Sequence, residues 1–427
     1  MGLLFADAKD LVGIKKTSDI NYMRVLKLGL KVIFCYPHIE GELQSKYVIL
    51  GKIWVTLLSI ATLSGQILYL YHKTGKIIFL KLGHTYITTA MNSVVSFRIM
   101  RTFLKSYNEI MNDFMIKIHI FNHKDRSEYA LKIQIIIHKA SHFVTVFLNS
   151  GMIFAIITFN IAPLYNNYRS GAFNDYKNGN ASFEHSVFFY IPEEYENNII
   201  IYTAIFISNW YVSLMCAMLF IQFDLILCLM IINLWGRFKI LIHSLETFGE
   251  SFHFETFNNT TQEGFTVNQS TEVNKKLEDI ITHHQVIIKF TSKLSSTFGP
   301  VLLHYYIFHI VTLCILLLEC SKMDPDALTR YGILTFLVVE QLIQVSVAFE
   351  ILETMSSKLE KAVYYLPWEC MNVSQRRVVL IMLMQAQRGG TVKALDMVNV
   401  GVQTMAAILR TSFSYFIMLQ ALEKEES

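Results

Sequence analysis

The chain is divided by seven apolar stretches, each long enough to cross a lipid bilayer as a helix. A helical span needs about 20 residues, and several of these stretches are longer, so we expect those helices to tilt or to protrude. Backbone groups find no water partner in lipid, which favours helices, and the period-2 pattern of a membrane barrel is absent. The stretches lie at about 47–71, 77–99, 133–161, 198–232, 280–318, 327–355 and 395–421.

The composition excludes several other classes of protein. Hydrophobic residues make up 53% of the chain and charged residues only 17%, against about 25% charged residues in soluble domains. Disordered chains are rich in charge and poor in aromatics, and disulfide scaffolds are dense in cysteine, whereas this chain has six cysteines in 427 residues. A net charge of +3 indicates no nucleic-acid partner. Neither a phosphate-binding loop nor a nucleophile elbow is present, so an enzyme is not indicated.

The basic residues between the apolar stretches predict the orientation. Segments on the side of the N-terminus hold 23 lysines and arginines, and the opposite segments hold 6. Positive charge stays on the cytosolic side, so we expect a cytosolic N-terminus and an extracellular C-terminus. In that orientation Asn180 is the glycosylation sequon exposed to the lumen.

The predicted architecture is an all-α membrane protein with seven transmembrane helices. Its first part, 1–46, is a cytosolic segment that either lies along the inner membrane surface or caps the bundle. Helices one to six occupy 47–355, and 356–394 is a cytosolic anchor region with an amphipathic helix at 370–388. The seventh helix and a short extracellular tail occupy 395–427.

Seven spans also suggest a G-protein-coupled receptor, and three features oppose that interpretation. The charge bias places the N-terminus inside, and the large outer loop 162–197 has no cysteine to tether it by a disulfide. Proline is scarce, so proline kinks are few. A solute transporter is typified by internal repeats and broken spans, and neither is visible.

The last hundred residues resemble the closing signature of insect odorant receptors. The runs SSKLEKAVYYLPW (356–368), RRVVLIMLMQAQRG (376–389) and ILRTSFSYFIML (408–419) carry the resemblance. The entry to the fifth span, LEDIITHHQVIIKF (277–290), is similar to the family's Leu-His-Phe pattern. Met405 departs from the family, many members of which have Phe there.

The resemblance implies an odorant-gated cation channel in the plasma membrane of olfactory sensory neurons. A tuning subunit of this kind assembles with the odorant co-receptor (Orco) as a heterotetramer around a central pore. The co-receptor itself has a long insertion between spans four and five, and the loop here, about 233–276, is short. A gustatory-type channel is the alternative, but the Ser-Tyr-Phe triplet at 414–416 continues as Gln420-Ala421 rather than the gustatory ending.

By resemblance, a small volatile odorant binds in the outer halves of spans two, three, four and six, by apolar burial. Tyr202, Phe206 and Trp210 share one helix face at a spacing of four, a pattern more often due to packing than to a pocket. The candidate ligand-binding residues are Tyr86, Met91, Phe154, Thr158, Tyr202, Phe206, Trp210, Tyr306 and Tyr331.

The resemblance also implies that the last span lines the pore. Met418 and Leu422 match the family's apolar gate positions, and their spacing of four puts both on one face. A narrow apolar ring excludes ions by dewetting. Gln420 is expected at the edge of the constriction and Ser414 along the pore.

Charged and metal-ligating residues within the spans give weaker signals. Glu340 and Glu350 are interpreted as inter-helix hydrogen-bonding groups rather than as a proton path. Histidine pairs such as His138 and His142 lack the further ligands that a metal needs. We therefore expect neither a metal nor a cofactor, and membrane lipid as the surrounding partner.

Overall fold

The fold is given by a computed structural model. It describes residues 8–11, 13–37, 46–77, 79–175, 183–192, 198–249, 267–321, 325–388, 393–394 and 398–426. Within these residues the protein is almost entirely helical, as the sequence predicted.

Each apolar stretch of the sequence overlaps a long helix, although the seventh, expected from 395, is helical only from Val402 and includes a short strand at Val398–Asn399. These helices are α2 (Lys46–Lys73), α3 (Phe79–Arg101), α5 (Glu128–Arg169), α7 (Ile199–Glu246), α8 (Val267–Ser321), α9 (Pro325–Tyr364) and α11 (Val402–Glu426). Among the described residues, five helices are long and apolar enough to cross a membrane by length and composition alone: α2, α5, α7, α8 and α9. The α3 and α11 helices carry more polar residues and are not among them.

Short elements connect the long helices. They are η1 (Ala8–Leu11), η2 (Thr17–Asp19), α1 (Asn21–Val32), α4 (Lys105–Asp113), η3 (Phe114–Ile118), η4 (Ile120–Arg126), α6 (Ala172–Asp175), η7 (Trp368–Cys370), α10 (Val373–Gln387), β1 (Lys393–Ala394) and β2 (Val398–Asn399). The two strands pair antiparallel, with Lys393 opposite Asn399.

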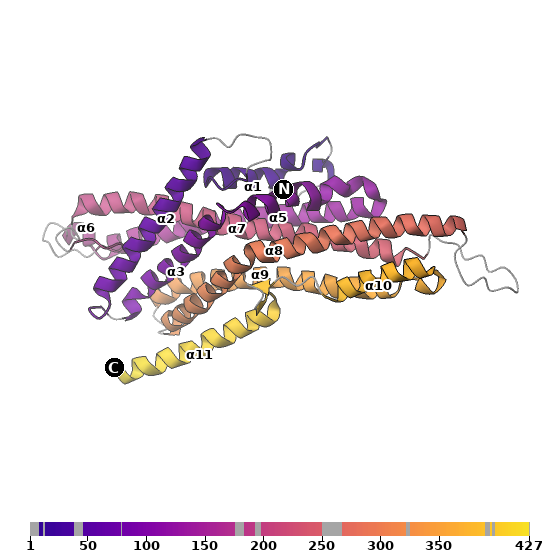
Figure 1. The fold of residues 1–427 in the computed structure, drawn as a ribbon. Helices are drawn as coiled ribbons and strands as arrows, with labels where there is room; N and C mark the ends of the chain where they lie inside the picture. Colours follow the sequence, from indigo (N-terminus) through magenta and orange to yellow (C-terminus); the bar gives the residue numbers. More distant parts are fainter. Residues whose placement is uncertain are drawn as a thin grey trace.

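The long helices alternate in direction along one axis of the molecule (Figure 1). The facing ends of α2 and α3, the end of α5, the facing ends of α8 and α9 and the end of α11 lie toward the left of Figure 1. The α10 helix and the facing ends of α7 and α8 lie toward the right. With the predicted orientation, the left end is extracellular and the right end cytosolic.

The helices α7 and α8 extend well beyond the stretches predicted as spans. The fourth stretch was expected to end near 232, and a loop was expected over 233–276, whereas α7 continues to Glu246 and α8 begins at Val267. At about 1.5 Å per residue, the 48 residues of α7 reach about 70 Å, roughly twice the hydrocarbon thickness. Phe238, Leu241 and Leu245 remain buried in this extension, so packing rather than lipid stabilises it.

The core of the bundle is centred on α7. Nearly every side chain from Leu219 to Leu234 is buried, because α5, α9, α3, α8 and α1 surround this segment. Gly236 allows a close approach, since a β-carbon there would collide with Ile137 of α5. A helix that is apolar on all sides is typical of a buried position.

The N-terminal segment packs onto the bundle through α1. Its residues Tyr22, Met23, Leu26 and Leu30 are buried against α5 and α7. Tyr22 Oη lies 2.9 Å from Nε2 of His119. Burial lowers the pKa of the His119 imidazole to about 3. The histidine is therefore neutral, and α1 caps this end of the bundle.

The amphipathic helix predicted at 370–388 corresponds to α10. Asn372 and Gln375 form a reciprocal capping box at its first turn. Gln375 Nε2 also donates to Asn274 Oδ1 of α8 at 2.9 Å. On the opposite face Leu380, Ile381 and Met384 are exposed, so α10 presents an unpartnered apolar surface.

Candidate ligand-binding region and gate helix

A segment between α6 and α7 folds into the end of the bundle where α2 turns into α3. We call residues 183–192 the inserted loop. Its backbone carbonyls accept hydrogen bonds from bundle side chains: Ser186 O lies 2.7 Å from His84 Nε2, and Val187 O accepts from Asn209 Nδ2 at 3.2 Å. Ser186 and Val187 are buried. The loop therefore covers this end of the bundle and ties α3 to α7.

Aromatic rings gather beneath and beside the inserted loop. The ring of Tyr202 stacks on Phe183 with 4.5 Å between centroids, and His185 lies 5.3 Å from Tyr202. Tyr202 Oη accepts a hydrogen bond of 3.1 Å from Asn167 Nδ2 of α5. The His84 ring stacks on Phe159 of α5 at 5.6 Å. We call these rings, with Asn167, the Tyr202 cluster. Apolar side chains with a few oriented polar groups are the usual lining of small-molecule sites.

The predicted stripe on α7 runs through this cluster. Tyr202 is buried, Phe206 and Trp210 are half-buried, and the three rings follow one another at 6.2 and 6.4 Å between centroids. One turn further, Ser213 Oγ accepts from Asn160 Nδ2 of α5 at 2.7 Å. The stripe therefore faces the α5 side of the bundle rather than lipid.

The other predicted ligand-binding residues occupy different surroundings. Tyr86 and Met91 of α3 are half-buried, and Tyr86 Oη lies 3.4 Å from Thr74 Oγ1. Tyr306 of α8 is buried in the core. Phe154 and Thr158 are exposed on α5, with Phe154 exposed to 56%, so the structure does not bring them to the Tyr202 cluster. The side chain of Tyr331 and the sequon Asn180 lie outside the described residues.

Sequence reasoning missed four residues that the structure brings to this region. His84, Phe159, Phe188 and Asn209 join α3, α5, the inserted loop and α7. The Phe188 ring meets His84 edge-on at 6.2 Å between centroids. A polar residue within an apolar span is the sequence signal that could have found His84 and Asn209, because such groups usually face a bundle interior.

A buried ion pair lies deeper in the bundle. Arg98 Nη2 donates to Asp224 Oδ1 at 2.8 Å, and Arg98 Nη1 donates to the carbonyl oxygen of Phe220 at 2.6 Å. The guanidinium also lies over the rings of Phe220 and Tyr305, at 4.4 and 5.2 Å. Both charged side chains are almost fully buried, as expected for ionisable groups within a membrane bundle.

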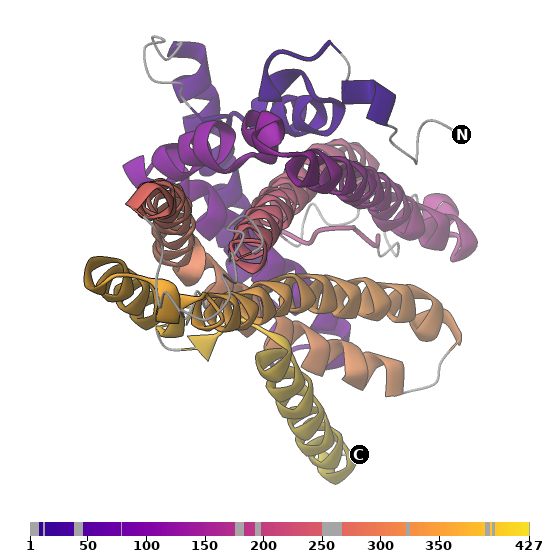
Figure 2. The ribbon, with the colours of Figure 1, turned by 90° about the vertical axis from the view of Figure 1, so that its right-hand side faces the viewer.

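The last helix has two different faces. Ile408 and Ser412 are buried against α8 and α9, and Ser412 Oγ donates to Ile310 O at 3.4 Å. Phe413, Ile417 and Met418 are exposed, and α11 extends away from the other helices (Figures 1 and 2). The chain alone therefore leaves an apolar face of α11 uncovered.

The predicted gate residues lie on or next to that uncovered face. Met418 is 57% exposed, Ser414 is exposed and Gln420 is half-buried. Ser414 Oγ donates to the Arg410 carbonyl oxygen at 3.0 Å, within the helix. The side chain of Leu422 lies outside the described residues.

The start of α11 is held by α9. The Glu350 Oε2 oxygen accepts a 3.1 Å hydrogen bond from the backbone nitrogen of Val402. A carboxylate at this position satisfies an unpaired amide of the first turn and complements the helix dipole. Glu350 is thus an inter-helix hydrogen-bonding group, as the sequence predicted.

Comparisons with known proteins give the family. The family model described as 7tm odorant receptor matches residues 81–413. The odorant receptor coreceptor of Anopheles gambiae is 23% identical over 192 residues, covering 44% of this chain and 39% of that protein. Odorant receptor 45a of Drosophila melanogaster is 26% identical over 152 residues, covering 35% and 40%. The matched segments thus span about two fifths of these relatives' lengths.

Solved structures show the same fold at low identity. The insect olfactory receptor OR5 from Machilis hrabei, in complex with eugenol, superposes with a TM-score of 0.72 at 12% identity, over 94% of this chain and 100% of that one. The same receptor's other structure gives 0.73 at 12% identity, covering 93% and 97%. Because the family model covers well over half of the chain, this protein is a member of the odorant receptor family, with the helical membrane-receptor fold that the closing motifs predicted.

Proposed function

We propose that this protein is the odorant-specific subunit of an odorant-gated, non-selective cation channel. A small volatile ligand binds among the Tyr202 cluster, the inserted loop and α3, and α11 lines a pore shared with other subunits. The observation that carries the proposal is the two-faced α11: one face packs on α8 and α9, and the other is apolar and uncovered. Lipid can cover an apolar face, but the polar Ser414 and Gln420 beside this one favour a pore shared with neighbouring subunits.

The packing supplies a route from ligand to pore. On one side α8 contacts α3, where Ser93 Oγ lies 2.9 Å from His304 Nε2. On the other side α8 contacts α11 through Ser412. A ligand that binds one arrangement of α3 and α7 more tightly shifts the population of that arrangement, and α8 carries the shift to α11.

We propose the co-receptor (Orco) as the partner in a heterotetramer. The exposed Leu380, Ile381 and Met384 of α10 form a second uncovered apolar face, suited to an intracellular anchor between subunits. The chain between α7 and α8, residues 247–266, is short, which favours a tuning subunit over the co-receptor. The olfactory sensory neuron's plasma membrane is the proposed location.

Recording with the co-receptor tests this function directly. Cells that express both chains are expected to give cation current in response to at least one volatile of a broad odour panel. Cells expressing the co-receptor alone, and cells expressing this chain alone, are the controls. Surface expression of both chains with silence across the panel would contradict the proposal.

The Met418→Ala variant tests the gate. Shortening an apolar side chain in a narrow ring weakens dewetting, so we expect a higher basal leak current or altered ion selectivity. Recording without odorant measures the leak. Ile116→Ala, which changes an exposed apolar side chain outside α11, is the control. Unchanged current in Met418→Ala would place the gate elsewhere.

The glycosylation pattern tests the orientation. With a cytosolic N-terminus, Asn180 is the sequon that faces the lumen during synthesis, and Asn180→Gln is expected to abolish the glycan shift on a gel. Asn372→Gln is the control on the opposite side. Loss of the shift in the control instead would invert the orientation and favour a G-protein-coupled receptor topology.

A further inference from the structure

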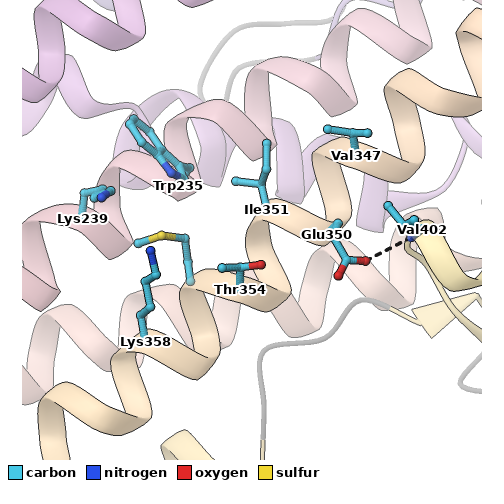
Figure 3. A pocket seen from close by; sticks show the side chains of 9 residues that line it. Trp235, Lys239, Val347, Glu350, Ile351, Thr354, Lys358 and Val402 are labelled. Atoms are coloured by element: carbon cyan, nitrogen blue, oxygen red, sulfur yellow. Dashed lines mark hydrogen bonds between the residues drawn. The ribbon is translucent and has the colours of Figure 1, made fainter.

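A groove of about 270 Å³ lies between α7, α9 and the start of α11. It is formed by Trp235 and Lys239 of α7, six residues of α9 from Val347 to Lys358, and Val402 of α11 (Figure 3). This position is remote from the Tyr202 cluster. The odorant site proposed above therefore does not explain this groove.

The groove lies across the predicted inner edge of the membrane. The sixth apolar stretch ends near 355, so Val347 and Ile351 lie within it and Lys358 lies beyond it. Val347 and Ile351 are exposed, which is usual for side chains that meet lipid. Trp235 provides an indole in the same groove, the ring that membrane interfaces favour.

The two ends of the groove differ in charge. Figure 3 shows Lys239 and Lys358 at one end and Val347 at the other. Neither lysine has an ion-pair partner among the described residues. The Lys239 amine lies 5.7 Å above the Trp235 ring. The Glu350 carboxylate points toward Val402, away from the lysines, and accepts the hydrogen bond of the Val402 amide, so the two ammonium groups are the charges at their own end of the groove.

We propose that this groove binds an anionic phospholipid of the cytosolic leaflet. Its headgroup phosphate lies between Lys239 and Lys358, and an acyl chain follows Ile351 and Val347 toward the bilayer centre. Basic pockets between helices on the cytosolic side are suited to such headgroups. This inference rests on the membrane orientation and the co-receptor complex in the proposed function, but not on channel activity.

The site gives the lipid a means of acting on the gate helix. Val402 lines the groove, and its backbone amide donates the hydrogen bond that Glu350 accepts. A bound lipid therefore favours whichever position of α11 completes the groove, and the lipid composition of the membrane biases the pore.

Lipid retention by the purified complex tests the site. The full chain with its co-receptor is reconstituted in phosphatidylcholine membranes with or without phosphatidylserine of the same acyl chains. The lipid that remains after extraction is measured by mass spectrometry. Each lysine near the surface is worth about 1 kcal/mol, or about fivefold in affinity. We expect the double variant Lys239→Ala/Lys358→Ala to bind phosphatidylserine about 25-fold more weakly. Its retention of phosphatidylcholine is expected to stay unchanged.

Two further variants keep the test decisive. Lys361→Ala changes an exposed lysine three residues along α9 that does not line the groove, and it is expected to leave retention unchanged. Lys358→Glu changes an exposed position with little effect on packing, and it is expected to lower retention more than Lys358→Ala. Equal retention in the double variant and in Lys361→Ala would overturn the proposal. So would a cross-link from Thr354→Cys to a neighbouring subunit, which would show that protein covers the groove.

Discussion

Arg98→Ala is expected to reduce the amount of folded receptor severely. The substitution leaves the Asp224 carboxylate buried without its partner, and it also removes the cation from the rings of Phe220 and Tyr305. Breaking a buried ion pair by removing one member costs about 3–5 kcal/mol. A loss of this size approaches the total stability of many proteins. Surface abundance and thermal unfolding of the purified complex measure it.

A double variant distinguishes the cost of an unpaired buried charge from the contribution of the ion pair itself. Replacing both charges, with Arg98→Met and Asp224→Leu together, leaves no uncompensated charge, so we expect it to recover much of the stability lost in either single variant. Lys105→Ala is the matched control, because the Lys105 side chain is 90% exposed and its contact with Glu109 is a surface pair. Wild-type stability in Arg98→Ala would show that the bundle can hydrate Asp224.

Tyr202→Ala is expected to disrupt the end of the bundle that we propose as the odorant site. The buried ring contacts Phe183 and Phe206, and its hydroxyl accepts from Asn167. Removing a buried aromatic ring costs about 3–5 kcal/mol, through lost burial and the cavity left behind. We expect the inserted loop to detach and odorant sensitivity to fall. Limited proteolysis of the loop and a concentration–response curve measure the two effects.

Tyr202→Phe distinguishes packing from ligand contact. It keeps the ring and removes one hydrogen bond, a loss of about 0.5–1.5 kcal/mol. If the hydroxyl also contacts an oxygen-bearing odorant, sensitivity falls for that odorant and not for a hydrocarbon of similar shape. Ile200→Ala changes an exposed side chain two residues away and is the control. Full sensitivity in Tyr202→Ala would exclude this cluster from the ligand site.

The periodic and compositional signals predicted the helices well because they act within one segment. Apolar stretches of membrane length predicted the long helices, and amphipathic spacing predicted α10, to which the structure adds the Asn372–Gln375 cap. Helix ends were predicted less well. The extension of α7 past 232 depends on partners such as Ile137 and Ile120 around Gly236, which local hydropathy does not contain.

The candidate site was only partly predictable. Sequence spacing placed Tyr202, Phe206 and Trp210 on one face, and the structure turns that face toward α5 and the inserted loop. The family resemblance placed Phe154 and Thr158 in the pocket, yet α5 is rotated so that both are exposed. The rotation of a helix about its axis follows from the shapes packed against it, and a span apolar on every side carries little periodicity to reveal it.

The sequence by itself determined the membrane class, the helical segments, the direction of the charge bias and the family resemblance of the last hundred residues. These properties follow from residue type and near-neighbour spacing. The tertiary structure decided which distant residues meet: Arg98 with Asp224, His84 with Ser186, and Glu350 with Val402. These partners lie 126, 102 and 52 residues apart, and such contacts are selected by side-chain packing between helices, which no local pattern encodes.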